Sequence, residues 1–233
     1  MRYREYVYFR IYENRGDCGK GILEDYTGTI IHDHWISYYK FKKCRHAECN
    51  VHTNRVLNGL AILDKIELAF EFKKFMSSID HERNDLIKNG IYSFSTERIK
   101  EIEDKYTESL INLGSYFEGL SENERKIYYK DGVNLVKRML KYKENHLLFL
   151  HDFNVPFGNN DAERPLRHFK LKKQSMGSAR SIIGSNNLIT NMTAIKTEYF
   201  KTSNLLDFIL ESFIGKKIEV CTKEKTNSCD MAE

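Results

Sequence analysis

The pattern of apolar and polar positions divides the chain into a strand-like beginning and a long helical remainder. In residues 3–12, apolar side chains alternate with polar or aromatic ones at the period of two that is typical of a β-strand. Residues 29–32 predict a short buried strand, and residues 44–51 predict a weaker third strand. Between them, the sequence predicts a short helix over residues 18–26 and one or two helical turns over residues 35–41.

The central part of the chain has a helical pattern. Residues 55–79, 95–120 and 121–142 repeat apolar positions at helical spacing, with mixed charges in between. Ser121 and Glu124 form a capping-box pattern, which predicts a helix start at this point.

The last third begins with an expected loop over residues 151–160, which contains Pro156 and Gly158. Helical patterns resume near residues 161, 185 and 203. The expected organisation is a first core part over residues 1–52, a helical insertion over 53–150, a closing core part over 151–213 and a polar tail over 214–233.

The composition permits a folded domain and indicates the cellular compartment in which to expect it. The chain has 233 residues, of which 41% are hydrophobic and 12% aromatic, so a sizeable core is expected. Its five cysteines are irregularly spaced, which does not indicate a disulfide framework. No apolar run approaches the roughly 20 residues that cross a bilayer, and the first residues lack a signal-peptide pattern. A cytoplasmic protein without a membrane partner is expected.

Charge is segregated near the end of the chain, although the net charge is only +4. Residues 164–197 contain no Asp or Glu. The basic residues in this window that predict contacts to a phosphate backbone are Arg164, Arg167, Lys170, Lys172, Lys173 and Arg180. The alternative is an ordinary solvated face, but such faces normally mix both signs of charge. DNA is therefore the predicted partner.

Two acidic residues are candidate metal ligands. Asp33 directly follows the apolar run 29–32, and Glu163 lies in the first turn of a predicted helix just before the basic window. Carboxylates held in this way can bind Mg²⁺, which prefers oxygen ligands. The alternative is that both acids only cap the ends of helices, Glu163 reciprocally with Asn160.

The segment 44–52 raises the question of zinc, because it contains Cys44, His46, Cys49 and His52. These ligands are crowded into nine residues, and on a strand Cys49 would face away from Cys44 and His46. Zinc is therefore not expected in this segment.

Three segments, which occur in the same order as in the family, resemble transposases of the insertion-sequence-66 type. Residues 28–39 resemble the segment around the second aspartate of that family, residues 49–55 resemble its Cys-x-x-His-x-x-Arg segment, and residues 159–164 with Arg167 resemble its Asn-Asn-x-x-Glu-Arg segment. The resemblance implies an α/β, RNase H-like core with a large helical insertion, mostly α by content. It also implies cutting and joining of transposon DNA ends with Mg²⁺ or Mn²⁺.

The resemblance also implies roles for individual residues. Asp33 and Glu163 would be the catalytic metal ligands, with carboxylates close enough to share an ion. The residues that would support them are Cys49, His52, Arg55 and Asn160. Pro165 predicts that the helix of Glu163 begins late, near Glu163 itself, or is kinked there.

Such enzymes use a third acid on an earlier strand, and no residue here matches it. The chain is therefore expected to be the C-terminal part of a catalytic region, with an incomplete core and an irregular sheet edge at residues 3–12. A homo-oligomer or a partner chain would supply the missing N-terminal part of the core. Strand transfer by this chain alone is not expected. The alternatives are a non-catalytic DNA-binding remnant, a helical interaction protein that uses residues 54–142, and a relic without function.

Overall fold

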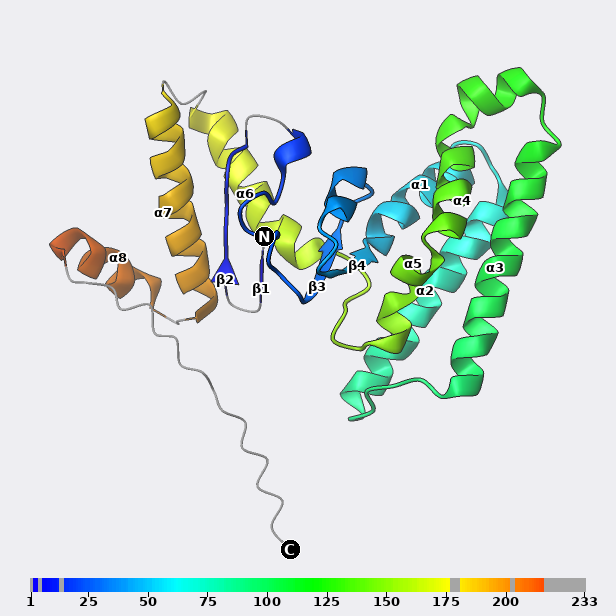
Figure 1. Cartoon of the computed structure of the whole chain (residues 1–233), viewed down its shortest axis with the longest axis horizontal. Helices are drawn as coiled ribbons and strands as arrows, with labels where there is room; N and C mark the ends of the chain where they lie inside the picture. The colour runs from blue at the N-terminus through cyan, green and yellow to red at the C-terminus, as the bar shows by residue number, and fades with distance from the viewer. Residues whose placement is uncertain (1, 4–5, 13–14, 177–180, 202–203, 216–233) are drawn as a thin grey trace, which may run out of the picture. The chain divides into compact units, whose positions relative to one another are not determined.

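The computed structural model describes residues 2–3, 6–12, 15–176, 181–201 and 204–215, and the chain is mostly helical, as predicted. It divides into two compact units (Figure 1). One unit comprises residues 12–163, and the other comprises residues 1–11 together with the chain from residue 164 onward.

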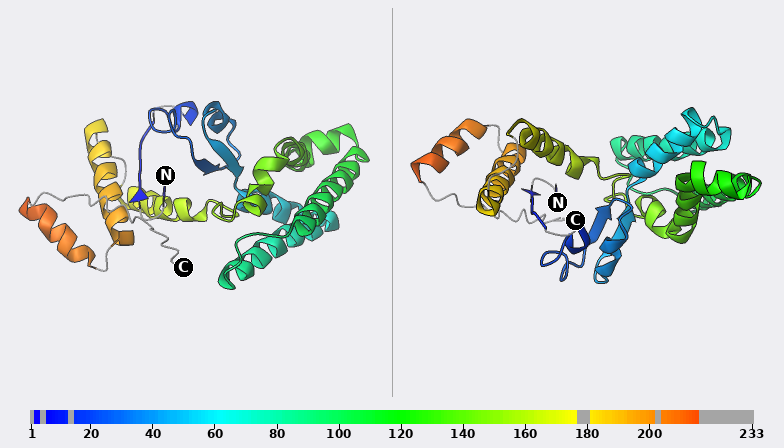
Figure 2. Two further views of the ribbon diagram at one scale, coloured as in Figure 1. Left: turned by 60° about the horizontal axis from the view of Figure 1, so that its bottom comes forward. Right: turned by 90° about the horizontal axis from the view of Figure 1, so that it is seen from above.

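A small parallel sheet lies in the unit 12–163. Strand β3 (Thr29–His32) pairs in parallel with β4 (Arg45–Glu48) (Figure 2). The last pair in register is His32 with Glu48. The strand 29–32 was predicted from its apolar run, and the weaker strand predicted over 44–51 is shorter, because α1 begins at Asn50. The connection between them contains the 3₁₀ helix η2 (Ile36–Lys40), which confirms the predicted helical turns.

The helix predicted over residues 18–26 is wrong. After the short 3₁₀ helix η1 (Arg15–Asp17), the chain forms turns instead. Gly19 and Gly21 have φ values of 85° and 75°, in the left-handed region that a right-handed helix excludes.

Five helices form most of this unit. In chain order they are α1 (Asn50–Ile62), α2 (Glu67–Lys88), α3 (Thr96–Glu118), α4 (Lys130–Lys141) and α5 (Lys143–His151). Helix α1 packs against α2 and α4, α3 packs against α2, α4 and α5, and α5 packs against β4. The stretch 55–79 that was predicted as one helix is divided between α1 and α2, since Lys65 between them has a φ of 55°.

The helices bury a shared apolar core, which stabilises the unit. A fully buried Leu, Phe or Met side chain contributes about 1.5–3 kcal/mol relative to exposure. The largest core side chains that are almost fully buried include Tyr106, Phe72, Phe149, Met76, Ile79 and Met139.

The capping box predicted at Ser121 is confirmed. The Ser121 amide donates to Glu124 Oε2 at 2.9 Å, and the Glu124 amide donates to Ser121 Oγ at 3.3 Å. These reciprocal bonds satisfy backbone amides just before the π-helical turn η3 (Glu124–Tyr128), which leads into α4.

The second unit has a different construction. Strands β1 (Arg2–Tyr3) and β2 (Tyr6–Val7) form an antiparallel pair, and helix α7 (Ile182–Lys201) packs beside β2 (Figure 1). Helix α8 (Leu205–Ile214) follows α7. Helix α6 (Asn160–Met176) begins at the end of the first unit and continues into the second.

The predicted strand 3–12 is only partly right, because β2 ends at Val7. The Thr197 hydroxyl accepts from the Val7 amide at 3.1 Å and donates to the Val7 carbonyl at 3.0 Å. The Phe9 amide donates to Thr193 Oγ1 at 3.1 Å. Threonines one turn apart on α7 therefore satisfy backbone groups that would otherwise pair with a strand.

Each sheet of the described residues has two strands. The RNase H-like core and the domain boundaries at residues 52, 150 and 213 therefore stay predictions. No described helix combines the length and the apolar character that a membrane span requires.

Candidate active site

The start of α1 is fixed from two sides. The Cys49 amide donates to the His32 carbonyl at 2.9 Å, which extends the β3–β4 ladder to the N-cap of α1. The Asn50 amide donates to the Phe157 carbonyl at 3.1 Å, and the Asn159 amide donates to Cys49 Sγ at 3.1 Å. The loop before α6 is therefore attached to the first turn of α1.

Gly158 permits this close approach. A Cβ at this position would lie 2.5 Å from Val51 Cγ2 and 3.4 Å from Cys49 Sγ. The first of these distances is a steric clash, so any side chain here would separate the loop from α1.

Glu163 faces α1 from the first turn of α6. Its Oε1 lies 3.5 Å from His52 Nε2, and its Oε2 lies 3.8 Å from Arg55 Nη2. His52 and Arg55 are three residues apart, so they lie on one face of α1, and Cys49 precedes them at the same spacing. The structure thus brings together three of the predicted supporting residues with the predicted acid.

Cys49, His52 and Glu163, called here the Glu163 cluster, offer ligand atoms within 4.8 Å of one another. Burial raises the pKa of the Cys49 thiol, but hydrogen bonds from the His52 side chain and the Asn159 amide outweigh it and lower the pKa. The hydrogen bond to Cys49 raises the pKa of His52, against the effect of burial, and the Glu163 carboxylate adds to the rise. Both pKa shifts act in the direction that favours the charged forms of Cys49 and His52.

Asp33 lies just after β3, as predicted, and is half-buried. Its Oδ1 accepts from the Trp35 amide at 3.1 Å, which supports the chain where it enters η2. The next residue, His34, has its ring centroid 6.2 Å from that of His52. The sharing of one ion by Asp33 and Glu163 stays a prediction.

The predicted DNA-binding residues lie along α6 and beyond it. Arg164 and Arg167 are exposed on α6, and Arg167 is four residues after Glu163, on the same face of the helix. Lys170, Lys172 and Lys173 belong to α6, but their side chains lie outside the described residues, as does Arg180.

Helix α6 begins at Asn160, whose side chain is exposed. The prediction of a late start near Glu163 is therefore wrong. The buried Pro165 lies inside the helix.

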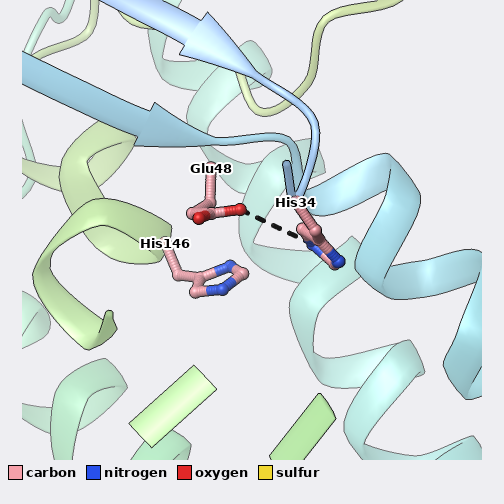
Figure 3. Close-up of side chains that lie close together, drawn as sticks. All are labelled: His34, Glu48 and His146. Carbon is pink, nitrogen blue, oxygen red and sulfur yellow. Dashed lines mark ion pairs between the residues drawn. The ribbon is translucent and has the colours of Figure 1, made fainter. Parts of the chain in front are cut away.

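A second group of polar side chains was missed by the sequence analysis. His34, Glu48 and His146, called here the Glu48 cluster, also offer ligand atoms within 4.8 Å of one another. They come from the segment after β3, the end of β4 and α5, and Figure 3 shows them turned toward one another.

Glu48 is held by direct hydrogen bonds. Its Oε1 accepts from the Tyr39 hydroxyl at 2.8 Å and from Arg138 Nη2. The carboxylate is fully buried, whereas 23% of the Glu163 side chain is exposed. The one local signal is that His146 directly precedes the apolar run 147–150, which could have marked it as a buried polar residue.

The family model described as "Transposase IS66 family" matches residues 2–187, which is most of the chain. No curated protein matches the chain, and no solved structure matches it. The matched region includes the three segments that carry the sequence resemblance, Glu163 and the three residues around it. The chain therefore belongs to the IS66 family of transposases.

Proposed function

We propose that this chain contributes Asp33 and Glu163 to the catalytic region of a DNA transposase, an enzyme that cleaves phosphodiester bonds at transposon ends and joins the released ends to a target. Family membership supports a transposase-type function. The observation that carries the finer proposal is the position of Glu163 beside His52 and Arg55. His52 and Arg55 are far from Glu163 in the sequence, yet both lie beside its partly exposed carboxylate.

Asp33 and Glu163 are the proposed ligands of Mg²⁺ or Mn²⁺. Both offer carboxylate oxygens, which such ions prefer, and the Glu163 side chain is accessible enough for an ion to reach it. A bound ion supplies Lewis-acid chemistry for in-line attack by water or a 3′-hydroxyl on a phosphodiester.

The chain's own residues position these groups. His52 and Arg55 place positive charge beside the Glu163 carboxylate, and Cys49 lies next to the imidazole of His52. Arg164 and Arg167 follow Glu163 on the same helix, where phosphate contacts would place a DNA backbone close to the acid. Lys170, Lys172, Lys173 and Arg180 would extend this contact, and Asn160 would support the start of the helix.

A nicking assay tests the proposal. Purified chain and supercoiled plasmid DNA are incubated with Mg²⁺ or Mn²⁺, and conversion to open circles is measured. Glu163→Ala should reduce the rate by about 100-fold or more, because a metal ion supplies several kcal/mol of transition-state stabilisation. The matched control is Glu108→Ala, an exposed acid on α3, which should retain the rate of the wild type. Nicking that survives Glu163→Ala at the control rate would eliminate this site.

The exposed Arg164 and Arg167 also favour a second function, DNA binding without cleavage. Both functions require affinity that falls steeply as salt rises, because phosphate contacts release counterions. Salt-sensitive binding together with no metal-dependent nicking would establish the second function in place of the first.

A further inference from the structure

The Glu48 cluster has the spacing of a metal site. His34 Nε2 lies 3.7 Å from Glu48 Oε2, and ligand atoms of all three residues lie within 4.8 Å of one another (Figure 3). A tetrahedral zinc ion with bonds of about 2.0–2.1 Å separates its ligand atoms by about 3.3 Å. The His34–Glu48 separation is already close to that value.

Two atoms of this cluster are buried without a hydrogen-bond partner among the described residues. They are Glu48 Oε2 and His146 Nε2, and their residues are 2% and 0% exposed. A buried polar atom without a hydrogen-bond partner costs about 1–3 kcal/mol, and this cluster contains two such atoms. Both atoms belong to residues that face the same small volume.

Both atoms are acceptors. The Asn50 side-chain amide nitrogen donates to the His146 carbonyl at 2.9 Å, which leaves Asn50 Oδ1 to accept from His146 Nδ1 at 3.0 Å. With the proton on Nδ1, His146 Nε2 presents a lone pair. Glu48 Oε2 also presents lone pairs, because Tyr39 and Arg138 occupy the other oxygen. Two buried acceptors in one cluster would be satisfied by a cation or a donor that reaches both.

We propose that His34, Glu48 and His146 bind a zinc ion. Two imidazoles and one carboxylate suit zinc, whereas Mg²⁺ selects oxygen ligands. In metal sites, the ring nitrogen of a histidine that does not bind the metal usually makes a hydrogen bond that fixes the ring. The contact of Asn50 with Nδ1 of His146 is of this kind. His34 Nε2 is 3.1 Å from Thr53 Oγ1, and ion binding exchanges this hydrogen bond for a coordinate bond.

Arg138 is compatible with the ion because it contacts the other carboxylate oxygen of Glu48. The buried pair of Arg138 and Glu48 explains why Oε1 is satisfied, but it leaves Oε2 without a hydrogen-bond partner. Access is available on one side, because 24% of the His34 side chain is exposed, and water can complete the coordination there.

The proposed ion has a structural role. It would join the segment after β3, the end of β4 and the interior of α5, and so fix the backbone next to Asp33. This site does not depend on DNA cleavage, because none of its ligands is a proposed ligand of Mg²⁺. It also differs from the crowded segment 44–52, from which it takes only Glu48.

Zinc binding by the full chain tests the proposal. The protein is stripped with a chelator and titrated with Zn²⁺ in competition with a chromophoric chelator. The wild type should bind one ion at this site. Removing a hydrogen-bond partner of a metal ligand weakens metal binding by roughly 10- to 100-fold. His34→Gln removes a ligand itself, so it should weaken zinc binding by more than this. The matched control is His151→Gln, a more exposed histidine on α5, which should bind as the wild type does.

The Glu163 cluster must be distinguished, since it contains Cys49 and His52. Cys49→Ser should retain the site, and Co²⁺ substitution should give no thiolate charge-transfer absorption. Zn²⁺ should also raise the melting temperature of the wild type and of His151→Gln, but not that of His34→Gln. Circular dichroism of the stripped proteins verifies that each variant is folded. The proposal is overturned if the wild type binds no zinc, if His34→Gln binds as tightly as the wild type, or if Cys49→Ser abolishes binding.

Discussion

The Glu48 cluster and the Glu163 cluster use similar side chains in the same unit, but they differ in their access to water. The Glu48 carboxylate is fully buried and bonded directly to Tyr39 and Arg138. The Glu163 carboxylate is partly exposed, and its cationic neighbours lie at 3.5 and 3.8 Å. A buried charge with direct partners contributes to the stability of the unit. A charge at a partly open surface can instead change its partners and bind an ion or lie beside DNA. Three substitutions would sharpen or break this contrast.

The largest effect is expected at Glu48. Glu48→Leu leaves the Arg138 guanidinium, which is 17% exposed, without its carboxylate. Breaking a buried pair from one side costs about 3–5 kcal/mol. Urea denaturation of the metal-free proteins measures this loss in the free energy of unfolding.

The control for Glu48 removes both charges. Glu48→Leu combined with Arg138→Met should recover most of the loss, because two apolar groups need no partner. A cost below about 1 kcal/mol for Glu48→Leu alone, the range of exposed pairs, would show that Arg138 reaches water and that the two clusters do not differ as described.

An intermediate effect is expected from His32, which lies opposite Glu48 in the β3–β4 register. Burial lowers the pKa of His32 from 6.5 to about 4, although the bond to the Asp33 carbonyl opposes this. Between these values the unfolded chain binds a proton that the folded chain does not, so stability falls as pH falls below 6.5. The loss between pH 7 and pH 5 is about 2 kcal/mol from this residue.

Unfolding free energies at pH 7 and pH 5 measure this dependence. His32→Leu should reduce the loss by about 2 kcal/mol. His81→Gln, which replaces an exposed histidine on α2, should leave it unchanged. An unchanged loss in His32→Leu would contradict the described burial of β3.

The smallest effect on stability is expected at Glu163. Glu163→Gln should change the free energy of unfolding by less than about 1 kcal/mol, because partly exposed ion pairs contribute little. Urea denaturation checks this. A loss as large as that of Glu48→Leu would make Glu163 a structural residue and remove the contrast between the clusters.

The sequence predicted the features that local patterns determine. The strand Thr29–His32 follows from its apolar run, and the capping bonds of Ser121 and Glu124 follow from their spacing. The convergence of Cys49, His52, Arg55 and Glu163 came from the family resemblance, which supplies long-range information that spacing alone lacks.

Other features depend on tertiary structure and were not predicted. The Glu48 cluster draws its members from three distant segments, and no local pattern shows that His34 and His146 face the same carboxylate. The early end of β2 at Val7 depends on hydroxyls of α7 that are nearly the whole chain away. The division between α1 and α2 depends on one residue, Lys65, with a positive φ.

Gly158 limits which sequences can preserve the position of Glu163. The spacing between the loop and α1 is set by contacts with Cys49, Asn50 and Val51, so substituting His52 or Arg55 should change the charge around the acid more than its location. Even alanine at 158 would instead displace the loop and carry the first turn of α6 with it. A redesign of this protein can therefore vary the neighbours of Glu163 freely only while it keeps glycine at this position.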